Sequence, residues 1–160
     1  MQLLHVALPL VAALGCGLMA GIFFAFSAFM MTALGRLPPA AGIAAMRSIN
    51  VAILNPLFFA LFFGTAALSL VAAIAAIVAW PVPAALYLFA GGLLYLVGGL
   101  VVTMQRNVPL NQALAASDPA GDEGARLWHR YLSVWTAWNH VRTVASLAAT
   151  AAFIMALRLG

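Results

Sequence analysis

The sequence predicts an all-α membrane protein, an antiparallel four-helix transmembrane bundle with a long fourth helix. The chain is 66% hydrophobic and only 6% charged, whereas about a quarter of the residues in a soluble domain are charged. No Asp, Glu, Lys or Arg precedes Arg36, and none lies between Arg47 and Arg106. Because a spanning helix needs about 20 apolar residues, the first stretch holds one span and the second holds two. A further apolar segment near the C-terminus supplies the fourth.

The first span is predicted over residues 3–34. It has no Lys or Arg before it, and it is longer than the apolar core of about 7–15 residues in a secretory signal, so a permanent span is favoured over a cleaved one. Ala13, Gly17 and Gly21 are spaced for close helix packing within the chain. Bulky side chains at the end of the span predict a wall that either packs the core or borders a flat ligand: Phe23, Phe24, Phe26, Phe29, Met30 and Met31.

A short helix and the second span follow. Pro38 and Pro39 end the first span, and residues 40–50 place their apolar side chains on one side, which predicts a short helix at the membrane interface. The second span, residues 56–79, is preceded by Asn55, a residue type that favours the N-cap of a helix. Capping is one role for Asn55, and ligand binding is the other that the sequence leaves open.

The third span is predicted over residues 83–106, after a tight hairpin at 80–83 that contains two prolines and an interfacial tryptophan. Its glycine pairs at 91–92 and 98–99 suit close helix packing. Pro109 is expected to end the regular helix near Asn107, because proline lacks the N–H that a helix interior requires.

The C-terminal part begins with a hydrophilic loop predicted at 111–122. Asp122 is expected to cap a fourth helix, with Glu123 in its first turn, and the span within that helix covers residues 127–157. The helix is too long for the bilayer alone, so its first turns are expected in the cytoplasm or the interface. Residues 1–160 are predicted to form a single membrane domain.

The seven basic residues are all arginines, and their positions predict the orientation. Five lie in or beside the connections at 36–47 and 106–130, and the hairpin at 80–83 has none. Since arginine-rich connections stay on the cytoplasmic side, we expect both of them in the cytoplasm and both termini outside, in the inner cell membrane. The arginines do not form a basic patch, so no nucleic-acid partner is expected.

Function is expected at two polar clusters, 107–111 and 135–143, that interrupt the apolar sequence. On the fourth helix one narrow stripe carries Trp128, Trp135, Asn139, Arg142 and Ser146. Antiparallel stacking of the spans brings further polar side chains to the same cytoplasmic end: Ser27, Asn50, Asn55, Thr103, Asn107 and Asn111. A half-polar cavity that opens toward the cytoplasm would satisfy these groups together.

Arg142 is the residue on which this prediction depends. No Asp or Glu lies in any predicted span, so its guanidinium must find carbonyls, amide oxygens, water or an anionic ligand. One interpretation is that the side chain snorkels to the interface and ties helix ends together through Asn107 or loop carbonyls. The other is a hole for an anion or enolate, walled by Trp135, Trp138 and the phenylalanines.

A metal or haem site is poorly supported, because no pair of histidines has metal-ligand spacing and Cys16 has no second cysteine. His140 lies at the edge of the polar stripe and is a candidate general base. The candidate catalytic residues are therefore Arg142, Asn139, His140 and Asn107. The candidate binding residues are Trp135, Trp138, Asn50, Asn55, Asn111, Ser27 and Phe24. No metal ligand is predicted.

Several motifs together resemble the anthrone-oxygenase-like family of small four-span membrane proteins, most of which have no known function. The motifs are the run Gly21–Ser27, Met46-x-x-Ile-Asn50, Asn55-Pro56-x-Phe58, Asn107-Val-Pro-Leu-Asn111 and Trp135-x-x-Trp-Asn-His-Val-Arg-Thr143. The resemblance implies a cofactor-free monooxygenase that converts anthrones to anthraquinones without metal or flavin. Such chemistry needs a base, fixed positive charge for the substrate anion and an apolar chamber, roles that fit His140, Arg142 with its asparagines, and the aromatic wall.

Two other functions remain open. The protein could bind or conduct a small aromatic or anionic ligand without catalysis, although the lack of acidic residues in the spans argues against a carboxylate proton relay. It could also be a structural subunit whose polar end docks another protein. The lipid bilayer is one expected partner, and the sequence leaves open whether the protein forms a homo-oligomer.

Overall fold

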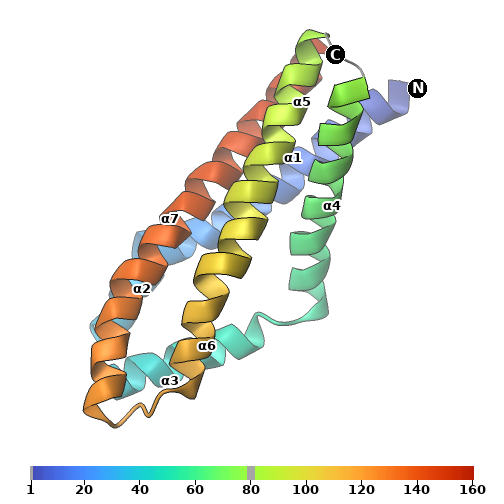
Figure 1. The fold of residues 1–160 in the computed structure, drawn as a ribbon. Helices are drawn as coiled ribbons and strands as arrows, with labels where there is room; N and C mark the ends of the chain where they lie inside the picture. Colours follow the sequence, from blue (N-terminus) through green and yellow to red (C-terminus); the bar gives the residue numbers. More distant parts are fainter. Residues whose placement is uncertain (1, 79–81) are drawn as a thin grey trace.

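Four long helical rods form the molecule (Figure 1). The computed structural model describes residues 2–78 and 82–160, with side chains from residue 6 onward. The first rod is α1 (Gln2–Ala25), the π-helical segment η1 (Phe26–Met30) and α2 (Met31–Gly35) in succession, and the second is α4 (Pro56–Val78). The third is α5 (Pro83–Leu93), the π-helical segments η2 (Leu94–Val101) and η3 (Thr103–Asn107), and α6 (Val108–Ala116); the fourth is α7 (Asp122–Leu159).

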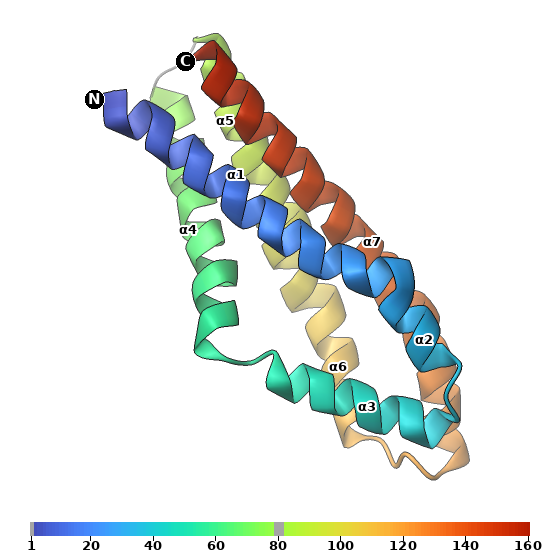
Figure 2. The ribbon, with the colours of Figure 1, turned by 180° about the vertical axis from the view of Figure 1, so that it is seen from behind.

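The rods pack in a ring, with α1 against α7 and α4, and α5 against α4 and α7. Both described ends of the chain lie at the same end of the bundle (Figure 1). At the opposite end α3 (Pro39–Ala52) runs across the base, in contact with α6 and α7 (Figure 2). The sequence prediction of a short helix in this place is confirmed.

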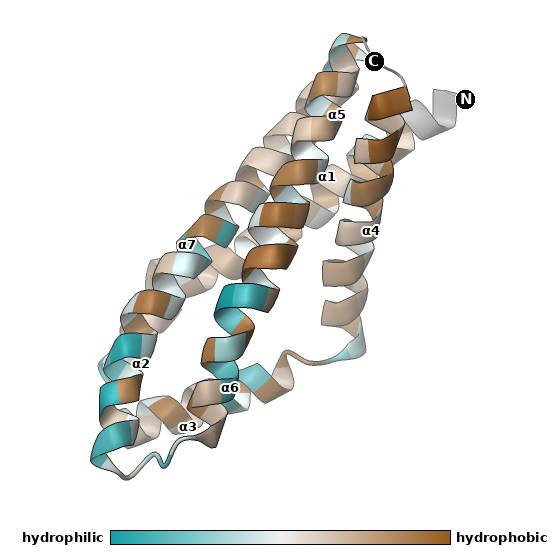
Figure 3. Cartoon of the chain, in the orientation of Figure 1, coloured by the Kyte–Doolittle hydropathy of each residue, from teal (hydrophilic) through white to brown (hydrophobic). Residues whose placement is uncertain are grey.

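The outer faces of the rods are apolar, as expected for contact with lipid. Each rod is long and hydrophobic enough to cross a bilayer, and large apolar side chains such as Leu14, Leu57 and Ile77 are exposed. Hydrophilic residues gather on the lower part of the third rod and on the first half of α7 (Figure 3). The protein is therefore an integral membrane protein with an all-α bundle fold.

The third rod corrects one prediction. The helix does not end near Asn107 but continues through Pro109 to Ala116, so the connection to α7 covers 117–121 instead of 111–122. The π turn of η3 explains this, because the N–H of Val108 bonds to the carbonyl of Thr103 and the helix is widened there. Pro109 follows this π turn as the second residue of α6.

Two smaller predictions are also wrong, and one lies outside the described residues. Gly21 is exposed, and a Cβ atom added to it would meet nothing within 4 Å, whereas Gly15 packs closely against Thr65. The N-cap of α7 is Gly121, and Asp122 is the first residue inside the helix. The predicted hairpin turn at Trp80 and Pro81 falls in the part of the chain that the structure does not describe.

Candidate functional site

Arg142 lies inside the bundle, with only 6% of its surface exposed. Its guanidinium carbon is 4.4 Å from the centre of the Phe23 ring and 5.0 Å from that of Trp135. Cations are attracted to the faces of aromatic rings at such distances, most strongly when water is excluded. The side chain is thus held between α1 and its own helix α7 and does not snorkel to the surface, which rules out the first of the two interpretations.

Two polar side chains accept hydrogen bonds from this guanidinium. Nη2 of Arg142 donates to Oδ1 of Asn139 over 2.6 Å, and Nη1 donates to Oγ1 of Thr103 over 3.3 Å. A guanidinium has more N–H donors than these two acceptors can use. Among the described residues, Nε of Arg142 has no partner although it is buried.

Asn139 joins Arg142 to the first rod. Its Nδ2 donates to the carbonyl of Phe23 and to Oγ of Ser27, both over 2.7 Å. Residues three apart share one face of an α-helix, which is why Asn139 and Arg142 meet. Ser27 also lies 3.3 Å from the hydroxyl of Thr143. The predicted stripe on α7 is confirmed, because all of its members are buried.

The π-helical turns of the first and third rods coincide with these contacts. Ser27 belongs to η1, and Thr103 and Asn107 belong to η3. Segments of π-helix are rare in proteins and occur frequently at functional sites. Sequence reasoning missed them, and the only available signal was a helix that carries polar residues just before Pro109.

An aromatic stack continues from Trp135 toward the start of α7. Trp128, Tyr131 and Trp135 lie nearly parallel, with successive ring centres 5.7 Å apart, and Phe26 meets Trp135 edge-on at 5.6 Å. Oδ1 of Asn111 accepts hydrogen bonds from the Tyr131 hydroxyl over 2.7 Å and from Nε1 of Trp135 over 2.8 Å. All of these stacked rings are buried.

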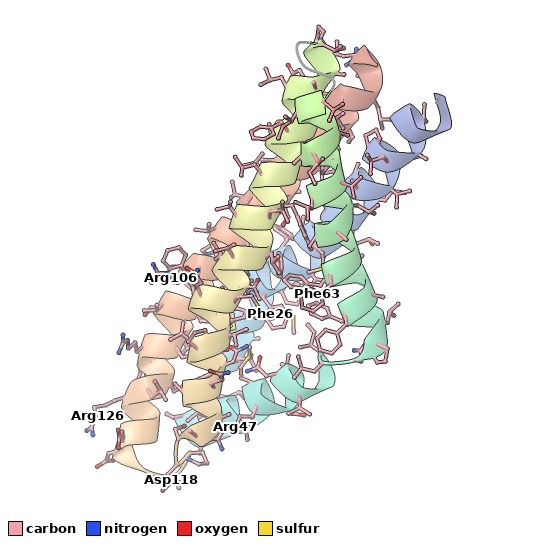
Figure 4. All side chains as sticks on the ribbon, turned by 45° about the vertical axis from the view of Figure 1, so that its right-hand side comes forward. Phe26, Arg47, Phe63, Arg106, Asp118 and Arg126 are labelled. Atoms are coloured by element: carbon pink, nitrogen blue, oxygen red, sulfur yellow. The ribbon has the colours of Figure 1, made fainter. Side chains whose placement is uncertain are left out.

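The charge of Arg142 has no acidic neighbour. The three carboxylates of the chain are Asp118, Asp122 and Glu123, all exposed. Even Glu123, on the same helix, is separated from Arg142 by about 28 Å at 1.5 Å per residue. Charged side chains such as Arg47, Asp118 and Arg126 gather near the α3 end of the molecule (Figure 4).

The other predicted residues fall into two groups. Asn107 is buried and donates to the carbonyl of Trp135 over 3.2 Å, and Asn50 lies beside Tyr131. Asn55 is exposed and caps α4, since its Oδ1 accepts the N–H of Phe58 over 3.0 Å.

The structure does not bring the remaining candidates to Arg142. Phe24 is 57% exposed, and Trp138 is half-buried with Arg106 over its ring at 4.8 Å. His140 is exposed, because adjacent residues of a helix point about 100° apart. The predicted wall of phenylalanines and methionines is therefore split between the core and the lipid-facing surface.

Four surface hollows lie away from Arg142. One of about 590 Å³ is formed by the loop before α7, including Asp118 and Glu123, and one of about 360 Å³ lies between α2 and α7. The other two are apolar, one between α1 and α7 and one at the far ends of α4 and α5. A chamber at Arg142 stays a prediction. Within residues 2–78 and 82–160, no three His, Cys, Asp or Glu side chains are grouped to hold a metal ion.

A comparison with known protein families shows which family the chain belongs to. The family described as anthrone oxygenase matches residues 58–152. The chain belongs to this family. The match contains Thr103, Asn107, Asn111 and the part of α7 around Arg142, so most of the site lies in the region that defines the family. The resemblance predicted from the motifs is confirmed. No curated protein and no solved structure matches the chain.

Proposed function

We propose that this protein is a cofactor-independent oxygenase of anthrone-like substrates and that Arg142 stabilises the substrate anion. One observation carries the proposal: a buried guanidinium with unused N–H donors lies against the rings of Phe23 and Trp135 and far from any carboxylate. A positive charge in such a place favours an electron-rich partner. Membership in the anthrone oxygenase family supports the same choice of substrate.

The reaction needs no electron donor besides the substrate. The CH₂ group opposite the carbonyl of an anthrone loses a proton to water, and the electron pair is delocalised onto the carbonyl oxygen as an enolate. Dioxygen adds to the carbanion carbon to give a peroxide, which takes up a proton. Loss of the second C–H proton and cleavage of the O–O bond release water and leave a carbonyl, so one O₂ yields one anthraquinone and one water.

The residues of the site would act on the enolate in this scheme. Arg142 would donate hydrogen bonds to the enolate oxygen and so strengthen the carbon acid, since fixed donors stabilise charge as it develops. Asn139 and Thr103 hold the guanidinium in place. Trp135 and Phe23 would exclude water from it. We assign no role to His140, because it is exposed on another face of α7.

We also propose that the arginine-bearing end faces the cytoplasm in the cell membrane. The arginines of that end, in contrast to Arg158 alone at the other, support this orientation. Arg142 is about 26 Å from the end of α7 at 1.5 Å per residue, while the hydrocarbon core is about 30 Å thick. The site would therefore lie near the inner boundary of the hydrocarbon, where flat aromatic molecules can enter from the lipid.

The test is turnover by the purified protein in lipid nanodiscs. Anthrone in air-saturated buffer should be converted to anthraquinone faster than in empty nanodiscs, and ¹⁸O₂ should label the new carbonyl. Arg142→Ala should lower kcat by about 100-fold, the scale of losing a donor to an oxyanion. Arg158→Ala, at the other end of the bundle, should leave kcat unchanged.

A rate equal to that of empty nanodiscs for anthrone and several related phenols would overturn the proposal. Should these compounds then raise the unfolding temperature of the wild type but not of Arg142→Ala, the site would bind such molecules without catalysis. Equal loss of activity in Arg142→Ala and Arg158→Ala would also count against the assigned role of Arg142.

A further inference from the structure

We infer that Asn111 is a positioning residue that acts through Trp135 on Arg142; its effect on turnover rests on the proposed function. Its amide oxygen accepts two hydrogen bonds, from Tyr131 over 2.7 Å and from Trp135 over 2.8 Å. Because that oxygen is used by two protein donors, Asn111 orients aromatic rings and does not bind substrate through it.

The bond from Trp135 fixes the plane of the indole. An indole has a single N–H, which lies in the ring plane, so a fixed acceptor selects one rotation of the ring. The backbone of Trp135 is held as well, since Asn107 donates to its carbonyl over 3.2 Å. Trp135 is thus held at its carbonyl and at its ring nitrogen by two residues of the third rod.

The orientation of Trp135 determines whether the face of its ring contacts the guanidinium of Arg142. The guanidinium lies 5.0 Å from the centre of this ring and 4.4 Å from that of Phe23. A rotated indole would withdraw one of the two faces. The guanidinium would then move toward the space left behind, and water would reach it.

The continuous helix through Pro109 is what delivers Asn111. Thr103, Asn107 and Asn111 recur every fourth residue along the third rod, and each contacts α7 at or beside the site. Thr103 bonds to Arg142 itself and the other two to Trp135. Had the helix ended near Asn107, the amide of Asn111 would not have reached the indole.

The experiment compares Asn111→Leu with Asn111→Asp in the full-length protein. Leucine removes the acceptor at similar volume, whereas aspartate keeps an oxygen for both donors. Gln112→Leu, an exposed neighbour on α6, is the matched control. The first readout is the rate at which phenylglyoxal modifies Arg142, followed by mass spectrometry of its peptide. The second is kcat and KM with anthrone.

We expect phenylglyoxal to modify Arg142 several-fold faster in Asn111→Leu, and at the wild-type rate in Asn111→Asp and Gln112→Leu. In Asn111→Leu, kcat should also fall about tenfold with little change in KM, since small displacements of a catalytic group are costly. If phenylglyoxal modified Arg142 in Asn111→Leu at the wild-type rate, the inference would be overturned. Should leucine prevent folding, Asn111→Ala gives the same comparison with a smaller change. If the wild type has no activity, the proposed function fails, and the modification rates alone still decide the role of Asn111.

Discussion

The two ends of the bundle are held together in different ways. The end that carries both termini has a core of small and apolar side chains, with Cys16, Met19, Ala149 and Phe153 fully buried. The end that carries α3 has a core of aromatic rings and long side chains, including Trp128, Tyr131 and Met46. The directed hydrogen bonds around Asn139 and Asn111 belong to this second end or to its border.

The difference is consistent with the proposed orientation, in which the terminal end lies in the bilayer and the α3 end lies near its inner boundary. Lipid is as apolar as the helix surfaces, so helices in the bilayer associate through close packing of small residues. A Cβ atom on Gly98 would overlap that of Ala145, and one on Gly92 would lie 2.5 Å from the carbonyl oxygen of Ser69. At the α3 end the polar side chains are buried away from water and have to be paired, and pairing fixes each ring and charge in one place.

The largest effect is expected from Asn139→Leu, which removes a fully buried amide with three hydrogen bonds. The change leaves Arg142 without its shortest bond, and we expect a loss of about 3 kcal/mol in the free energy of unfolding, the scale of an uncompensated buried charge. Unfolding by SDS in mixed micelles measures it.

The matched control lies about two turns further along the same stripe of α7. Ser146 is fully buried on the same helix and its hydroxyl has no partner among the described residues. Ser146→Ala should therefore be neutral or slightly stabilising, because no hydrogen bond is lost. Equal destabilisation by both changes would show that the loss in Asn139→Leu does not come from its hydrogen bonds.

The second effect comes from the close helix contacts of the apolar end. Gly98→Ala places a methyl group on Ala145 of α7, where neither Cβ can move without its backbone, so we expect a loss of about 2 kcal/mol. Gly64→Ala meets no atom within 4 Å and should stabilise α4 by about 0.5–1 kcal/mol, since alanine favours helix more than glycine. The changes in the free energy of unfolding that the two substitutions cause, measured in the same micelles, should have opposite signs. A Gly98→Ala variant as stable as the wild type would mean that the third rod and α7 pack less closely than the structure shows.

The spans and the buried stripe on α7 could be predicted from the sequence, because both depend on hydropathy and helical periodicity. The exposure of Phe24 and the burial of Phe23 could not, since both are apolar and a membrane helix has no polar face to distinguish lipid from core. The π turns were also not predicted from the sequence. Pro109 predicted a helix end, but the π turn of η3 precedes it and the helix continues.

A third effect tests how α3 is fixed across the base. Arg47 donates to the carbonyl of Leu114 through Nε over 2.9 Å and through Nη2 over 2.6 Å, and to the carbonyl and hydroxyl of Ser117. Leu114 and Ser117 lie at the C-terminal end of α6, where the Leu114 carbonyl also accepts the N–H and the hydroxyl of Ser117, so Arg47 ties α3 to the end of the third rod. Arg47→Gln should cost about 1.5 kcal/mol and make the connection at 53–55 more sensitive to protease. The exposed Arg126 gives a control, since Arg126→Gln should change neither quantity.

The smallest effect decides between the two roles that the sequence left open for Asn55. As a cap, its Oδ1 accepts the N–H of Phe58 over 3.0 Å at the start of α4. Asn55→Ala should then lower the free energy of unfolding by about 1 kcal/mol, while Asn55→Asp, which retains the capping oxygen, should restore it. Both variants should keep the wild-type KM, because Asn55 is exposed and its amide is used by the backbone. A raised KM in Asn55→Asp at unchanged stability would instead assign Asn55 to the ligand, and would extend the polar site from α7 to the edge of the second rod.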